Sequence, residues 1–155
     1  MTTWQGTQTV KIIQGDEGRQ YCALNVGVSN QPDAAATCLS LNARLPLPKS
    51  EFEMKQFSGH FIQSWLDLTD PDKTGDVSAW KDIEGNPADY VNWMHLSGTH
   101  SNGIPFGSTG GAAAWHNYGN SISGRGLVTD HNGETTNILV ICVQEIIQPE
   151  SKLSL

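Results

Sequence analysis

The chain has 155 residues, a length that favours one domain with a sizeable core. Its 16 acidic residues outnumber 9 Lys and Arg, and no basic stripe is available for a phosphate backbone, so nucleic acid is excluded as a partner. No stretch approaches the ~20 apolar residues that span a bilayer, so we expect no membrane insertion of this segment. Charged residues make up only 16%, and small polar residues fill the gap, which favours strands and loops.

The first third of the chain predicts strands followed by two helices. Residues 7–13 form a β-prone run, and residues 21–24 start a second strand. Capping side chains and a Pro at 29–33 precede apolar residues spaced by three or four from Ala34 to Leu45, which predicts a first helix. Ser50 and Glu53 form a capping box that starts a second helix.

The rest of the chain alternates between strand signals and irregular sequence. Residues 64–68 read as a strand, with residues 78–82 as its hairpin partner. From 84 to 126 no convincing period is present, and an irregular stretch of that length is usually functional. Residues 138–143 are apolar and β-branched, which predicts a strand at the centre of the sheet.

This order of elements resembles the C-type lectin-like domain over residues 30–145. The run WLDLTD at 65–70 looks like the family's Trp-Ile-Gly-Leu strand, and ICVQE at 141–145 is similar to its closing strand. The resemblance implies an α+β fold with two helices packed on a small, mostly antiparallel sheet and a long irregular loop region. We expect a single domain at 1–148 followed by a polar tail at 149–155. By the same resemblance, Trp65, Trp80 and Trp93 are core residues.

The run CLSLNARLPLP at 38–48 resembles the first helix of the lectin-like tip domain in intimin and invasin adhesins of bacteria. Those domains carry one disulfide from this helix to the last strand, which implies a Cys38–Cys142 bond here. Closing a loop of about 100 residues is worth roughly 4 kcal/mol in the chain-entropy model. The alternative is three buried, reduced thiols. Cys22 is left over as a buried thiol, an alternative partner, or an attachment point for another chain.

Two calcium hypotheses are weak in this sequence. DPDKTGD at 70–76 matches the opening of an EF-hand loop, but the twelfth position is Lys81 where a Glu is needed, so we predict a turn. The lectin family's calcium site needs a Glu-Pro-Asn or Gln-Pro-Asp triplet and a Trp-Asn-Asp triplet. Neither is present, and LVTD at 127–130 keeps only Asp130. We therefore expect no required cofactor, and calcium-assisted sugar binding stays open only as an alternative.

Catalytic and zinc signatures are also weak. His95, His100, His116 and His131 lack the spacing of a zinc protease, so we interpret them as solvated loop residues. No nucleophile elbow or phosphate-binding loop is present. The formylglycine-generating oxidases share the lectin-like fold, but they need a redox cysteine pair, and Cys22 alone is spare. We expect no enzyme and no metal site.

Aromatic and amide side chains in the irregular half form the predicted ligand-binding site, since such groups suit sugar stacking or a protein hot spot. Its residues are Trp115, His116, Asn117, Tyr118, Asp130, His131 and Asn132. The alternative is that residues 112–115 form a core strand, with His116 and Asn117 at its end.

These observations predict an extracellular recognition or adhesion domain on a bacterial, phage or virion surface. Its partner would be a host cell-surface protein, as the intimin and invasin resemblance implies, or a surface glycan, as the wider family implies. A third hypothesis is a structural domain within a longer chain or an oligomer.

Overall fold

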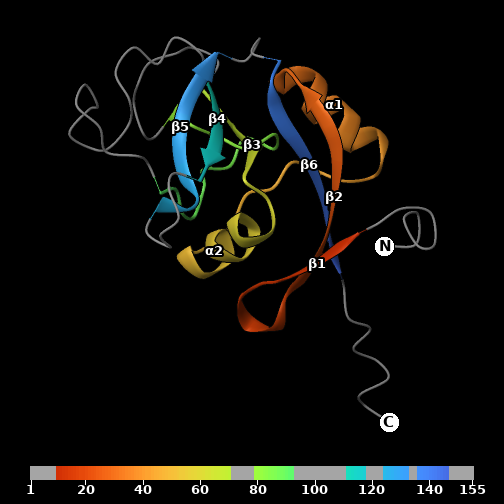
Figure 1. The fold of residues 1–155 in the computed structure, drawn as a ribbon. Helices are drawn as coiled ribbons and strands as arrows, with labels where there is room; N and C mark the ends of the chain where they lie inside the picture. Colours follow the sequence, from red (N-terminus) through yellow and green to blue (C-terminus); the bar gives the residue numbers. More distant parts are fainter. Residues whose placement is uncertain (1–9, 71–78, 93–110, 118–123, 133–135, 147–155) are drawn as a thin grey trace.

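The strands form two small antiparallel sheets accompanied by two helices (Figure 1). The computed structural model describes residues 10–70, 79–92, 111–117, 124–132 and 136–146, with the backbone alone at 130–132. The sheets have the strand orders β1-β2-β6 and β3-β4-β5. The elements are β1 Lys11–Gln14, the 3-10 turn η2 Asp16–Gly18, β2 Gln20–Ser29, α1 Gln31–Ser40, α2 Glu51–His60, β3 Gln63–Thr69, β4 Gly111–His116, β5 Leu127–Asn132 and β6 Ile138–Ile146.

The strands send alternate side chains into two apolar clusters, as the twofold period of a strand requires. On β4, Ala113 and Trp115 join the cluster that contains Met54 and Phe57 of α2. Ala112 and Ala114 belong to the other cluster, which contains Ala34 and Cys38 of α1. The two helices therefore cover opposite faces of the strands, and β4 is buried on both sides.

Strand β6 connects the two sheets. It pairs with β2 along its whole length, as Figure 1 shows for the two long strands. On its other side, the Ile141 backbone N–H donates to the Ser64 hydroxyl (3.3 Å) and the Leu139 N–H donates to the Gln63 side chain (3.1 Å). The central position expected for this strand is wrong within its own sheet, because the order β1-β2-β6 places β2 in the centre and β6 at the edge that faces β3. The expected single sheet is instead two, because β3 side chains take the place of backbone partners at this junction.

Helix α1 begins as the sequence predicts and ends earlier. The Asn30 side chain accepts the Asp33 N–H at 2.8 Å and caps the first turn. The apolar spacing continues to Leu45, yet the helix stops at Ser40 because Asn42 adopts the left-handed region with φ of 58°. The Gln144 side-chain amide then donates to the Leu41 and Asn42 carbonyls (3.3 and 2.8 Å), which satisfies the helix end.

The stretch 84–126, predicted to be irregular, contains strand β4, and strand β5 begins directly after it at Leu127. Ala has a low β-propensity, and a strand buried on both faces lacks the alternation of apolar and polar residues that marks a half-buried strand. The run Ala112–Ala114 is fully buried in this way. The alternative of a core strand at 112–115 is therefore confirmed, and the prediction of irregular chain is wrong at Gly111–His116, while residues 93–110 and 118–123 lie outside the described residues.

The predicted hairpin between residues 64–68 and 78–82 is reduced, within the described residues 79–92, to one antiparallel bridge at the end of β3. Lys81 forms single bridges with Thr69 and with Pro87, and β3 pairs with β4 instead. The Asp82 side chain accepts the N–H groups of Glu84 and Asn86, both at 2.9 Å, so this segment satisfies its backbone donors locally rather than in a ladder.

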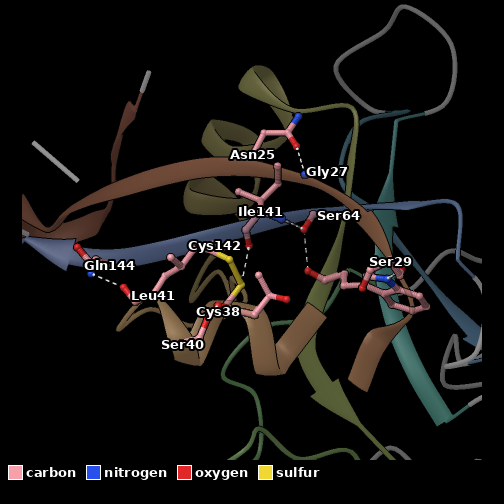
Figure 2. Close-up of a disulfide and its surroundings, with 12 residues drawn as sticks. Asn25, Gly27, Ser29, Cys38, Ser40, Leu41, Ser64, Ile141, Cys142 and Gln144 are labelled. Carbon is pink, nitrogen blue, oxygen red and sulfur yellow. Dashed lines mark hydrogen bonds between the residues drawn. A yellow bond between two sulfur atoms is a disulfide. The ribbon is translucent and has the colours of Figure 1, made fainter. Parts of the chain in front are cut away.

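The Cys38–Cys142 disulfide joins α1 to β6 across 104 residues, as the family resemblance implied (Figure 2). Both sulfur-bearing side chains are fully buried, and the close-up shows the bond passing from the helix to the strand above it. Cys22 is free and buried on β2. Of its three interpretations the buried thiol fits, and attachment to another chain would require β2 to open.

The core tryptophans are confirmed where the structure describes them. Trp65 is fully buried and Trp80 is 2% exposed, while Trp93 lies outside the described residues, as do the predicted turn at 71–76 and the tail at 149–155. Within the described part of the chain, neither helix has the length and apolar character needed to cross a membrane.

Candidate functional site

Trp115, the aromatic centre of the predicted site, lies in the core. Its side chain has no exposed surface, it packs against Phe57 with ring centroids 6.1 Å apart, and its indole N–H donates to the Phe61 carbonyl at 3.4 Å. The predicted ligand-binding role of Trp115 is therefore corrected to a structural one. A buried indole offers a ligand neither a stacking face nor a free donor.

His116 and Asn117 follow Trp115 at the end of β4, and both are half-buried. His116 Nδ1 lies 3.2 Å from the Gln63 side-chain nitrogen. The Asn117 amide nitrogen donates to the Ser58 carbonyl at 2.8 Å, and its oxygen accepts the Gly126 N–H at 3.0 Å. Asn117 thus ties the end of α2 to the start of β5, which leaves little of its amide for a ligand. Tyr118 lies outside the described residues.

The remaining predicted residues lie at the other end of the same strand pair. The register places His116 opposite Leu127 and Gly111 opposite Asn132, so the Asp130–Asn132 backbone runs beside the beginning of β4. A strand of six residues separates the two groups by roughly 17 Å. The six predicted residues whose backbone is described therefore form two separate groups rather than one site.

One end of the β3-β4-β5 sheet gathers three ends of described chain. The Asp70 N–H donates to the Gly111 carbonyl at 2.8 Å, and Gly111 is paired with Asn132. Residues 71–78 follow Asp70, residues 93–110 precede Gly111, and residues 133–135 follow Asn132. Asp70, Gly111 and Asn132 therefore lie together where the three strands end, and we call this place the sheet end. Asp130–Asn132 belong to it and Trp115–Asn117 do not.

A second candidate site is a cleft of about 420 Å³ beside Arg44, which we call the Arg44 cleft. Arg44 follows the turn after α1, and its backbone exchanges two hydrogen bonds with Val143 of β6 (2.8 and 3.0 Å). Its guanidinium contacts Asp67 and Glu84, both at 2.5 Å, and lies 3.8 Å from Asp82. One cation therefore faces three carboxylates.

The charge state of this cluster depends on burial. Burial raises the pKa of Asp67 above its ordinary value of 3.8, although the Arg44 guanidinium and the Ile83 N–H, which donates at 3.1 Å, both favour the ionised form. Burial lowers the pKa of Arg44, but the neighbouring carboxylates, Asp67 foremost, outweigh it and the net shift is upward. The Arg44 guanidinium therefore stays charged.

A third polar cluster surrounds Glu53 and is structural. Its carboxylate is fully buried and accepts the backbone N–H groups of Asp16 (2.9 Å) and Lys49 (3.0 Å), the Tyr21 hydroxyl (3.1 Å) and the Arg19 guanidinium (3.1 Å). Burial raises the pKa of Glu53, but these donors together hold it below the ordinary 4.5. Burial and the nearby Glu53 charge raise the pKa of Tyr21 to about 12.

The predicted histidines do not converge in the described part of the chain. His95 and His100 lie outside it, and the His131 side chain is not described. Among the described residues, no three His, Cys, Asp or Glu side chains are grouped so as to hold a metal ion.

Solved structures that superpose on this structure share one type of fold. The mouse scavenger receptor C-type lectin carbohydrate-recognition domain superposes with a TM-score of 0.61 at 22% identity, over 83% of this chain and 91% of that one. The cow CD23 C-type carbohydrate-recognition domain gives 0.60 at 19% identity, over 84% and 90%. A calcium-independent type II antifreeze protein gives 0.62 at 16% identity, over 91% and 99%. The chain has the C-type lectin-like fold.

Comparisons of the sequence add nothing to this likeness, since no protein-family model and no curated protein matches it. The C-type lectin-like neighbours support the resemblance at the level of the fold, while the finer likeness to intimin and invasin stays a hypothesis.

Sequence reasoning missed the Arg44 cleft within this C-type lectin-like fold. The run at 38–48 was assigned to the first helix, although Arg44 lies four residues beyond its end. The excess of acidic residues at 67, 82 and 84 was a usable signal, but nothing local to the sequence indicates that they share one arginine. The sequence indicated Glu53 only as part of the capping box of α2. That it also accepts hydrogen bonds from Arg19 and Tyr21 was missed for the same reason, because both lie more than thirty residues away.

Proposed function

We propose that this chain is a recognition domain that binds a surface ligand and performs no chemistry. The observation that carries the proposal is the sheet end, where Asp70, Gly111 and Asn132 bring three chain segments to one edge of a lectin-like sheet. Residues at the end of a rigid sheet suit ligand binding, because the scaffold fixes their positions. The residues proposed to take part in binding are Asp130, His131 and Asn132.

The proposed ligand is a protein on a cell surface, bound without calcium. Calcium takes six to eight oxygen ligands, and the family's calcium triplets are missing from this sequence, with Asp130 the one carboxylate left near the second of them. A protein ligand needs a broad face and no ion. The role would be adhesion at the surface of a bacterium, phage or virion, as in the intimin-like hypothesis.

A surface glycan is the second candidate ligand. Among the similar structures, the cow CD23 domain was solved in the presence of an oligosaccharide, and a murine dendritic cell inhibitory receptor 2 lectin domain was solved in complex with an N-glycan. A calcium-independent C-type lectin from Saxidomus purpuratus is also similar, with a TM-score of 0.59. A glycan-binding role would therefore not have to depend on calcium.

The proposed location is extracellular. The Cys38–Cys142 disulfide supports it, because such bonds persist in oxidising compartments and are rare where thiols are kept reduced. A buried disulfide that joins the first helix to the last strand suits a domain that works outside the cell.

A binding experiment on cells separates the two ligand classes. The labelled chain is applied to cultured epithelial cells treated with trypsin, with glycosidases or with neither, and to a glycan array with and without EGTA. The protein hypothesis predicts cell binding that trypsin removes and glycosidases leave unchanged, with no signal on the array. A signal on the array would favour the glycan, and its loss in EGTA would show that calcium is required. The double variant Asp130→Ala/Asn132→Ala should lose at least tenfold in affinity, while Asp33→Asn, an exposed change on α1, should not. Full binding by the double variant would refute the sheet end as the site.

A further inference from the structure

The Arg44 cleft is a second concave surface, separate from the sheet end of the proposed function. It lies between the extended chain after α1, the segment 82–89 and the end of β6. Its volume of about 420 Å³ falls within the range of small-ligand sites. Leu45, Leu47, Pro48 and Val143 give it an apolar lining with room for an aliphatic stem.

The charges that line the cleft are unbalanced. Two cations, Arg44 and Lys49, face five carboxylates, which belong to Asp67, Asp82, Glu84, Asp89 and Glu145. The first three share the Arg44 guanidinium. Asp89 and Glu145 are exposed and form no ion pair with any described residue, so the cleft has two carboxylates available to a ligand.

This charge pattern selects one ligand chemistry. An anion would meet an excess of negative charge, and a neutral ligand would leave that excess uncompensated. An ammonium or guanidinium group satisfies the free carboxylates, and an aliphatic stem behind it packs on the apolar lining, as Lys and Arg side chains do elsewhere.

Two exposed apolar side chains beside the cleft indicate that the cation belongs to a polypeptide. Leu39 of α1 and Ile83 are 52% and 51% exposed, and together they line a small depression next to Arg44 and Asp67. A free amine would leave both side chains in water. A peptide that places a basic side chain in the cleft can cover them with a neighbouring apolar residue.

We propose that the Arg44 cleft binds a lysine or arginine side chain of a partner protein, whose adjacent apolar side chain packs on Leu39 and Ile83. This site is independent of the sheet end, so variants of Asp130 and Asn132 leave it unchanged.

The test is an NMR titration of the full ¹⁵N-labelled chain. The probes are a capped Leu-Lys dipeptide, the capped Leu-norleucine dipeptide that lacks the ammonium, and n-butylammonium. The Lys peptide should shift the amide signals of Leu47 and Val143, the norleucine peptide should not, and n-butylammonium should bind several-fold more weakly. Asp89→Asn/Glu145→Gln should weaken Lys-peptide binding by roughly three- to tenfold at low salt, which is the combined effect expected when two exposed ion pairs with the ligand are lost.

The matched control is Asp33→Asn/Glu17→Gln, which removes the same number of charges from exposed positions outside the cleft and should leave affinity unchanged. Leu39→Ser should weaken the peptide and not n-butylammonium. Equal shifts by the Lys and norleucine peptides, or equal losses in both charge variants, would overturn the cation site. Equal affinities of peptide and n-butylammonium would overturn the polypeptide partner.

Discussion

Replacing Glu53 with Gln should destabilise the domain by about 3 kcal/mol at pH 7. The substitution keeps the size of the side chain and removes its charge. One oxygen of Glu53 accepts from Asp16 and Arg19, and the other accepts from Lys49 and Tyr21. Glutamine replaces one of these oxygens with a donor, so whichever pair faces the new NH₂ group loses its acceptor.

The expected loss of unfolding free energy follows from the hydrogen-bond donors that Glu53→Gln leaves without an acceptor. Breaking a fully buried ion pair costs about 3–5 kcal/mol, but the Arg19 side chain is 24% exposed and regains some water, so about 2 kcal/mol is expected for the lost charge. A buried backbone N–H without an acceptor adds about 1 kcal/mol. Space for rearrangement is small, because a Cβ added to Gly15 would lie 2.5 Å from the Glu53 carboxylate.

Urea unfolding followed by tryptophan fluorescence measures this change, and the m-value should stay unchanged. In thermal unfolding the midpoint temperature should fall by about 6–12 °C. Glu51→Gln is the matched control, since Glu51 lies in the same first turn of α2 but is exposed. Its cost should stay below about 1 kcal/mol, the value of a charge at a helix N-terminus.

The pH dependence tests the cause. Because the folded pKa of Glu53 lies below 4.5, the unfolded chain takes up this proton first as the pH falls. The stability that Glu53 contributes is complete above the unfolded value and is lost as the pH drops through the folded one. The gap between wild type and Glu53→Gln should therefore shrink below about pH 4.5. A gap under 1 kcal/mol at pH 7, or one of equal size at pH 3, would refute the reasoning.

Three further outcomes are expected. Cys38→Ala/Cys142→Ala should cost about 4–5 kcal/mol in urea unfolding, from the 104-residue separation. Thiol titration of the denatured wild type should count Cys22 alone, and three thiols would contradict the disulfide. Trp115→Ala should lower stability by about 3–5 kcal/mol by calorimetry, and a loss of ligand binding with stability intact would return Trp115 to the site. Asn117→Ala should cost about 1–3 kcal/mol by urea unfolding, because the buried Ser58 carbonyl and Gly126 N–H lose their partner; a neutral result would mean that water replaces the amide.

The sequence predicted the elements whose signals are local. Asn30 and Ser50 accept the N–H groups that their capping patterns indicate, so both helices begin where expected. Strand β6 was found because a run of β-branched residues is a signal that needs no partner. The disulfide came from resemblance and not from spacing, since 104 residues separate its cysteines.

The sequence could not predict features that arise from tertiary contacts. Strand β4 lacks alternation because both of its faces are buried, so its three alanines look like loop. Trp115 was assigned to a ligand because an aromatic residue beside His and Asn has the composition of a binding site whether it points inward or outward. Its alternation with Ala114 places it against α2, and only the pairing of β4 with its neighbours determines that direction.

The antiparallel pairing of β2 with β6 determines how the domain responds to a pulling force. Gln20 lies opposite Ile146, so chain that enters β2 and chain that leaves β6 do so at the same end of the ladder. Once β1 has separated from β2, a load applied on both sides would break the β2–β6 hydrogen bonds one pair at a time, starting from Gln20 and Ile146, rather than all together. The opening stops at Cys142, because the covalent bond to Cys38 then carries the load. Helix α2 and the strands β3, β4 and β5 that form the sheet end lie within the loop closed by Cys38 and Cys142, so the load would not pass through them. The Arg44 cleft would instead lose Val143 and Glu145 as the end of β6 is drawn out.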